Sequence, residues 1–150
     1  MEKLLASGLG IGYIRKGGGT VASIATCLGL YLMLPQGGTL PVPLMLLVTG
    51  VLLVLGTIVS TRVQRYWGKD NYRVVIDEIA GMWISMIYLP VTVSNLLIGL
   101  ILFRLFDIYK PFFIRKMENL PGGRGVMMDD VLAGIYTNLL LEFMVHLHLI

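Results

Sequence analysis

Five of the nine acidic residues of this chain stand inside or at the rim of apolar segments long enough to cross a membrane. They are Asp77, Glu78, Asp107, Asp129 and Asp130. A carboxylate at membrane depth is costly, so it is kept mainly where it lines a cavity, meets a cation or holds an ion. The segments must therefore pack so that these acids face a protein interior rather than lipid.

The composition indicates an integral membrane protein with a single domain over residues 1–150. The chain is 56% hydrophobic and 14% charged, whereas a soluble domain carries about 25% charged residues. The lone Cys27 excludes an internal disulfide and a cysteine metal site. The net charge of +3 comes without basic runs interleaved with aromatics, which favours membrane lipids over nucleic acid as partners.

Five apolar segments predict helices, namely residues 19–34, 42–60, 74–89, 95–109 and 126–149. Prolines at positions 35, 90 and 111 follow three of them and favour their ends there. Residues 4–14 are too short and too rich in glycine for a span, which favours an interfacial or re-entrant segment. The expected fold is an all-α bundle of about four to five transmembrane helices with this short N-terminal segment.

The basic residues predict the topology. If all five segments cross, every lysine and arginine falls on one side, because the loops near residues 35–41 and 90–94 contain neither. The positive-inside rule makes that side cytoplasmic. We therefore expect a multi-pass membrane protein with its acids at similar depth near the cytoplasmic face.

Two of the acidic helix starts resemble each other. Asp77 and Glu78 are followed by Ala80-Gly81, and Asp129 and Asp130 are followed by Ala133-Gly134. Small residues let helix backbones approach closely in a membrane. We expect these two helices to meet through their glycines and to direct their acids at a shared site, which Asp107 would join from the end of a third helix.

Clustered carboxylates need protons, basic partners or a divalent metal to neutralise them. Ligands that are all oxygen favour Mg²⁺, Ca²⁺ or Mn²⁺ over Zn²⁺, and Mg²⁺ is often shared between carboxylates and a substrate phosphate. Arg104 and Lys110 flank Asp107 at a spacing of three residues and suit a phosphate. Gly122–Gly125 and Lys16–Thr20 each lead into a helix, where backbone N–H groups could hold an anion, with Thr20 as a candidate N-cap.

Structural explanations exist for each acid taken alone. A carboxylate near a helix N-terminus is favoured by the helix dipole, which covers the acids at positions 77, 78, 129 and 130. Asp107 stands at a C-terminal end, where Arg104 and Lys110 could pair with it. The joint clustering at one depth favours a functional site over these separate explanations.

At these residues the chain resembles the phosphatidylglycerophosphatase A family of bacterial inner-membrane enzymes. Residues 77–84, DEIAGMWI, are similar to the family's DExxGMWI. Residues 103–111, FRLFDIYKP, are similar to its FRxxDxxKP, and residues 122–134, GGRGVMMDDVLAG, are similar to its GGxGxMxDDxxAG. Residues 18–23, GGTVAS, keep the glycine, threonine and serine of the family's PGTxGS loop but lack its proline and second glycine.

The resemblance implies Mg²⁺-dependent hydrolysis of phosphatidylglycerophosphate to phosphatidylglycerol and phosphate at the cytoplasmic face. On this hypothesis the Mg²⁺ ligands are Asp77, Glu78, Asp107 and Asp130, and Asp129 is a further ligand or the base. The phosphate would be bound by Thr20, Arg104, Lys110 and Arg124. Attack by water and an aspartyl-phosphate intermediate both stay open.

Two other classes of function use the same acids. One is a Mg²⁺-dependent lipid phosphotransferase. The other is a small ion or proton carrier, although a carrier more often has polar residues along the whole crossing, and here the outer halves are almost purely apolar. The sequence leaves the oligomeric state open.

Overall fold

The computed structural model describes residues 1–34, 37–69 and 71–150, and within these ranges the chain is helical with no strand. The elements in chain order are α1 (Glu2–Ala6), a 3₁₀ turn η1 (Ile11–Tyr13), α2 (Gly18–Met33), α3 (Val42–Trp67), α4 (Ile76–Ser85), α5 (Val93–Tyr109), α6 (Ile114–Met117) and α7 (Gly123–His146). Of the prolines expected to end helices, Pro35 lies outside the described residues. The all-α prediction is confirmed for the part of the chain that is described.

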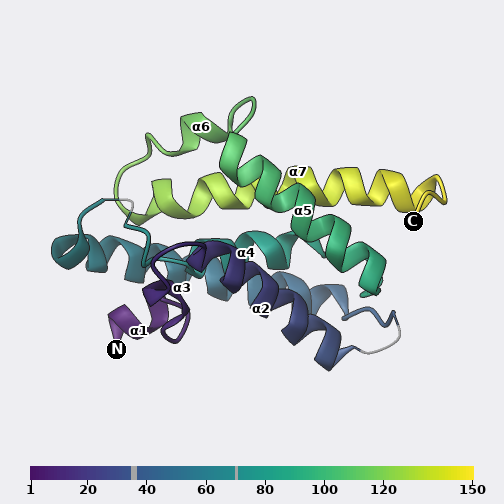
Figure 1. Cartoon of the computed structure of the whole chain (residues 1–150), viewed down its shortest axis with the longest axis horizontal. Coiled ribbons are helices and arrows are strands. Elements are labelled where there is room, and N and C mark those ends of the chain that lie inside the picture. The colour runs from purple at the N-terminus through teal and green to yellow at the C-terminus, as the bar shows by residue number, and fades with distance from the viewer. Residues whose placement is uncertain (35–36, 70) are drawn as a thin grey trace.

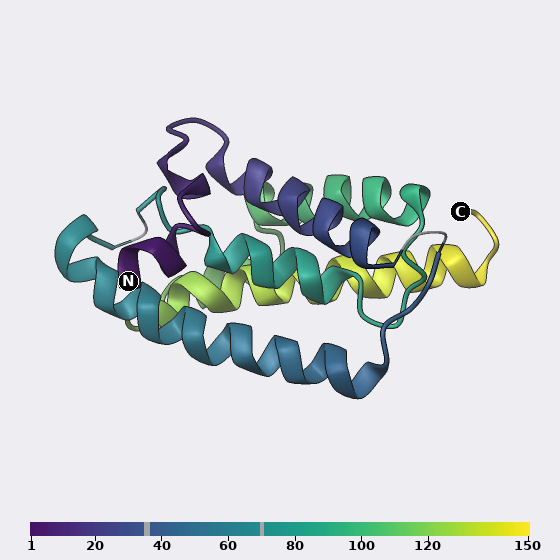
Figure 2. The ribbon, with the colours of Figure 1, turned by 90° about the horizontal axis from the view of Figure 1, so that it is seen from below.

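Helices α4 and α7 form the centre of the bundle. Helix α3 lies on one side of them, while α2 and α5 cover the other (Figures 1 and 2). The short α1 packs against α3, and Glu2 forms ion pairs with Arg62 and Arg65 near the end of that helix. The N-terminal segment therefore docks on the bundle and does not add a long helix to it.

The contact between α4 and α7 is made through glycines. A Cβ atom added to Gly134 would stand 2.5 Å from the Gly81 carbonyl oxygen, and one added to Gly81 would stand 2.7 Å from the Asp130 carbonyl oxygen. No larger residue fits at either position without moving a helix. The prediction that these two helices meet through their glycines is confirmed.

Apolar side chains on both faces of this central pair form the core. Met82, Met86 and Phe103 are fully buried between α4, α5 and α7, and Val63 and Met127 are buried between α3 and α7. The polar groups of the central helices are thus held between two packed layers.

Helix α4 is shorter than the segment 74–89 that the sequence predicts. It spans ten residues, about 15 Å, and ends at Ser85 before the chain turns through Tyr88 at a φ of +66°. The Asn138 amide of α7 donates to the Ser85 and Ile87 carbonyl oxygens at 3.2 and 2.7 Å. This tertiary contact satisfies carbonyls at the helix end, and the sequence of α4 alone gives no sign of it.

One helix among the described residues is long and apolar enough to cross a membrane, namely α3 with 26 residues. Helix α2 is apolar but has 16 residues, about 24 Å. The prediction of four to five crossing helices is therefore confirmed only as an all-helical bundle with one candidate span.

Candidate active site

A polar cavity of about 160 Å³ opens where α4 begins, α5 ends and α7 completes its first turns. Its walls carry all five acids that the sequence singles out, together with one lysine and one further acid. The lining residues are Asn71, Tyr72, Val74, Asp77, Glu78, Asp107, Lys110, Glu118, Val126, Asp129 and Asp130. Three helices distant in sequence thus bring their acids to one place.

Local structure explains how α4 presents its acids. The Val75 N–H donates to the Ala6 carbonyl oxygen at 2.9 Å, which ties the start of α4 to the end of α1. Asp77 and Glu78 then stand in the first turn of α4, where the positive end of the helix dipole favours carboxylates. The dipole eases the local cost of these charges, but it does not pair them.

Three carboxylates form a tight group. Asp77, Glu78 and Asp130 each offer an oxygen, and these oxygens lie within 4.8 Å of one another. Asp77 Oδ1 and Glu78 Oε2 are buried and have no hydrogen-bond partner among the described residues. Buried carboxylate oxygens without partners are costly, and a set of ligands that are all oxygen suits a hard divalent cation. The residues present therefore fit a Mg²⁺ ion.

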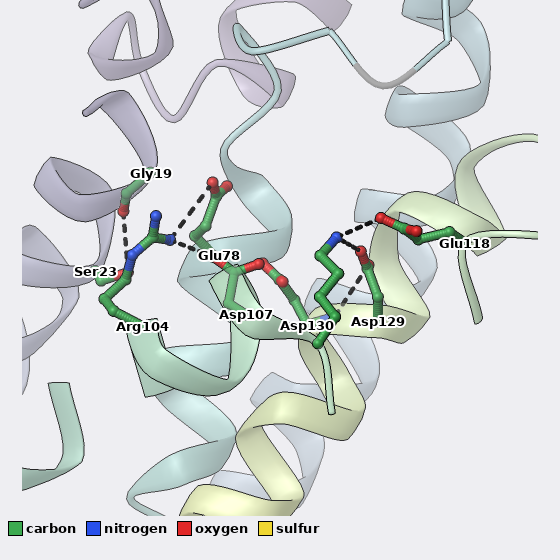
Figure 3. A network of polar contacts seen from close by, with 9 residues as sticks. Gly19, Ser23, Glu78, Arg104, Asp107, Glu118, Asp129 and Asp130 are labelled. Carbon is green, nitrogen blue, oxygen red and sulfur yellow. Dashed lines mark hydrogen bonds and ion pairs between the residues drawn. The ribbon is translucent and has the colours of Figure 1, made fainter. Parts of the chain in front are cut away.

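Asp107 lies on the same cavity but has a basic partner. Its Oδ2 is 2.6 Å from Arg104 Nη1, and the same nitrogen lies 3.9 Å from Glu78 Oε1 (Figure 3). Arg104 does not line the cavity among the described residues, so it neutralises Asp107 and Glu78 from behind. Of the four predicted metal ligands, the structure groups three and sets Asp107 beside them in an ion pair.

Lys110 joins the cavity from the end of α5. Its Nζ lies 2.6 Å from Asp129 Oδ2 and 2.6 Å from Glu118 Oε1 (Figure 3). Burial alone would lower the pKa of Lys110, but the hydrogen bonds and charges of Asp129 and Glu118 outweigh it and raise that pKa. Lys110 is therefore a fixed positive charge at the cavity wall.

Glu118 is a cavity residue that sequence reasoning missed. It follows α6, a four-residue helix that the sequence does not predict, and its side chain is 40% exposed. A signal was available, because Glu118 is the one acid between Lys110 and the paired acids at 129 and 130. Its role as a second partner of Lys110 depends on tertiary contact.

Two predicted phosphate-binding residues lie elsewhere. Arg124 is exposed and, like Thr20, is not among the described residues that line the cavity. The expectation that Thr20 caps a helix is wrong, because α2 begins at Gly18 after Gly17, which has a φ of +84°. The residue of this loop that reaches the site is Gly19, where a Cβ atom would collide with the Glu78 carboxylate.

The glycines at the start of α7 serve packing. The Gly123 N–H donates to Thr61 Oγ1 of α3 at 2.8 Å, and a Cβ on Gly125 would stand 2.6 Å from the Leu120 carbonyl oxygen. The Gly123 N–H, one of the donors expected to meet an anion, is thus used by α3. Close approach of backbone to backbone explains why this helix begins with glycines.

Comparison with known proteins places these features in context. A family model described as phosphatidylglycerophosphatase A matches residues 4–145. The curated protein of that name from Haemophilus influenzae is 39% identical over 89% of the chain and 82% of its own length. The one from Escherichia coli is 34% identical over 95% of the chain and 83% of its own length. A Bacteroides thetaiotaomicron protein with the provisional name phosphatidylinositol-3-phosphatase is 37% identical over 92% of the chain and 89% of its own length. No solved structure matches.

Proposed function

The chain belongs to the phosphatidylglycerophosphatase A family and is a phosphatase, and we propose that it hydrolyses phosphatidylglycerophosphate to phosphatidylglycerol and phosphate with Mg²⁺. The observation that carries the proposal is the group of three carboxylates beside Lys110. Two of the three have buried oxygens that meet no hydrogen-bond partner in the described part of the chain. A site with this many acids binds a phosphate dianion only if cations offset them.

Asp77, Glu78 and Asp130 would hold the metal. When bound, Mg²⁺ supplies positive charge that neutralises these acids and stabilises the charge that develops on a transferring phosphoryl group. Arg104 keeps Asp107 and Glu78 in place through its ion pairs. Six carboxylates line the cavity, and Arg104 and Lys110 offset only part of their charge, so bound Mg²⁺ would lower the remaining negative charge before an anion enters.

Lys110 would bind the phosphate. An ammonium group has three N–H donors, and the acids at 118 and 129 take two of them. The third is left for a phosphate oxygen in the cavity. Lys110 and the Asp130 N–H both donate to Asp129, which fixes that carboxylate at the cavity wall. Asp129 is then placed to accept a proton from the attacking water and to return it to the glycerol oxygen as the P–O bond to that oxygen breaks.

The charges around the site support its location at a membrane face. Asn71, Tyr72 and Val74, which precede α4, line the cavity, and Arg62 and Arg65 are exposed near the end of α3. Basic residues at the end of a spanning helix favour the cytoplasmic side. We propose a multi-pass protein of the bacterial inner membrane with the cavity at its cytoplasmic face.

A second substrate is favoured by one relative, whose provisional name specifies a phosphatidylinositol 3-phosphate. Both lipids carry a phosphate monoester on a polyol, and a cavity that recognises the phosphate alone would accept either. The comparison of the two therefore belongs in the first experiment.

That experiment measures phosphate release from each lipid in detergent, with Mg²⁺ and with EDTA. We expect Mg²⁺-dependent release from phosphatidylglycerophosphate, with phosphatidylglycerol formed in equal amount. Release that continues in EDTA would overturn the metal site. Release from the inositol lipid alone would transfer the proposal to that substrate, and transfer of phosphate to an acceptor would indicate a phosphotransferase. Folded protein that is inactive on both lipids would overturn the proposed function.

A further inference from the structure

An apolar groove of about 520 Å³ runs along α7 on the side of the bundle that carries Lys110. Its walls come from α5, from the segment between α5 and α6, and from α7, and five of its seven lining residues are aromatic. They are Phe106, Phe112, Phe113, Tyr136, Leu139, Leu140 and Phe143. The proposed reaction uses none of them.

The groove and the carboxylate cavity both have walls on α7 and on the end of α5. Tyr136, Leu140 and Phe143 follow Asp129 at intervals of seven, eleven and fourteen residues, which places all four on the same side of the helix. At about 1.5 Å per residue, the groove begins roughly 10 Å from Asp129 and extends to roughly 21 Å from it. The polar cavity and the apolar groove thus follow one another along the same side of α7.

The other wall joins the two parts through the end of α5. The Lys110 N–H donates to the Phe106 carbonyl oxygen at 2.8 Å, so a residue of the groove and the lysine of the cavity share one helical turn. The rings of Phe106 and Phe112 both meet Tyr136 edge-on, with centroids 6.1 and 6.2 Å apart. These contacts fix the end of the groove that lies nearest to Lys110.

We propose that this groove binds an acyl chain of the lipid substrate and thereby positions its phosphate at Lys110. The inference rests on the proposed function, because it takes the phosphate of a lipid to lie in the cavity. A lipid has a polar phosphate at one end and long apolar chains at the other, which matches the order of cavity and groove along α7.

The expected effect of the groove is on positioning. A chain that moves from surrounding lipid into the groove gains packing contacts and little hydrophobic free energy, since lipid is already apolar. Holding the chain in one direction restricts how the headgroup is presented, and small misplacements of a reacting group are costly.

A second groove sets the matched control. It lies between α2 and α5, has a volume of about 360 Å³, and includes Leu97. Its nearest charged residue along α5 is Arg104, which is already paired with Asp107. A tryptophan at Leu97 therefore fills an apolar groove of the same bundle without entering the one that leads to Lys110.

The experiment compares Leu140→Trp with Leu97→Trp on two substrates, dioleoyl phosphatidylglycerophosphate and its deacylated headgroup. We expect Leu140→Trp to lower the ratio of kcat/KM for the diacyl substrate to that for the headgroup by about tenfold. Leu97→Trp should leave the ratio as in the wild type. The unfolding temperature in detergent is measured for both, and Leu140→Phe replaces Leu140→Trp if the latter does not fold.

Each outcome decides the matter. An unchanged ratio in Leu140→Trp overturns the proposal, as does an equal fall in Leu97→Trp. A fall in Leu97→Trp alone would place the chain between α2 and α5 instead. Failure of the wild type to release phosphate from any lipid is a different result, which overturns the proposed function before the groove is tested.

Discussion

Gly134 of α7 lies directly against the Gly81 carbonyl oxygen of α4, and Gly81 lies against the Asp130 carbonyl oxygen in return. The second contact involves the backbone of Asp130, one of the three carboxylate residues that group at the cavity. The spacing between the two helices therefore also sets the spacing between Asp77 and Asp130. The close contact between α4 and α7 therefore both packs the bundle and positions the acids of the candidate site.

We predict that Gly134→Ala destabilises the protein by about 1–3 kcal/mol, because its Cβ meets backbone that cannot move without moving a helix. Activity should fall with it, as the acids of α4 and α7 are forced apart. Gly50→Ala is the matched control in α3, where a Cβ meets nothing within 4 Å. It should stabilise slightly, by about 0.5–1 kcal/mol. Thermal unfolding in detergent measures both, and equal unfolding temperatures would contradict the prediction.

Gly19→Ala should separate activity from stability. The new Cβ would collide with the Glu78 carboxylate and stand 3.1 Å from Arg104 Nη1, and both groups end flexible side chains that can shift. We expect the unfolding temperature to stay close to that of the wild type while kcat falls at least about tenfold, as a displaced ligand requires. Gly29→Ala, on the same helix with open space around it, should keep full activity. Retained activity in Gly19→Ala would mean that the position of Glu78 is not critical.

The acid cluster could be predicted from the sequence because the features that indicate it can be read from residue spacing and charge along the chain. Each acidic pair precedes a glycine by about one turn, and the positions of the basic residues predict one depth for these two helix starts and for Asp107 at the end of a third helix. The end of α4 could not be predicted in this way. The segment stays apolar through Leu89, but the helix ends at Ser85. There the side-chain amide of Asn138, from a distant part of the chain, donates hydrogen bonds to the Ser85 and Ile87 carbonyl oxygens.

Tertiary structure also decides which of the predicted basic residues line the cavity. Lys110 and Arg124 are both close to the acids in the sequence. In the structure Lys110, the left-handed residue after α5, lines the cavity, whereas Arg124 is exposed. Glu118 reaches the site through the turn that follows α6, and its contact with Lys110 is invisible to periodicity. Which side chain faces inward at the end of a helix depends on the tertiary path of the loops.

The contrast between Lys110 and Arg124 is testable with the same substitution at each site. Lys110→Met should lower kcat/KM for phosphatidylglycerophosphate by about ten- to a hundredfold, because a hydrogen bond to a charged group is worth about 1.5–3 kcal/mol. Arg124→Met should stay within about twofold of the wild type, since a solvated surface charge contributes little. Initial rates at saturating Mg²⁺ give both values. A larger loss in Arg124→Met than in Lys110→Met would restore Arg124 as the phosphate ligand.

Binding of Mg²⁺ can be tested by unfolding as well as by activity. Asp77, Glu78 and Asp130 repel one another without a cation, so the wild type should unfold at a higher temperature in Mg²⁺ than in EDTA. The gain is about 2.7 kcal/mol at a Mg²⁺ concentration of 100 times Kd. Asp77→Asn removes one charge and one ligand. It should abolish turnover, unfold in EDTA at a higher temperature than the wild type, and gain less from Mg²⁺.

The matched control for this last prediction is Glu2→Gln, which removes an acid that pairs with Arg62 and Arg65 away from the cavity. Its response to Mg²⁺ should equal that of the wild type, because Glu2 is not among the carboxylates that line the cavity. An unfolding temperature of the wild type that ignores Mg²⁺ would contradict the metal site. An Asp77→Asn protein that gains as much from Mg²⁺ as Glu2→Gln would remove Asp77 from the ligands, because a lost ligand must weaken the binding to which stability is linked.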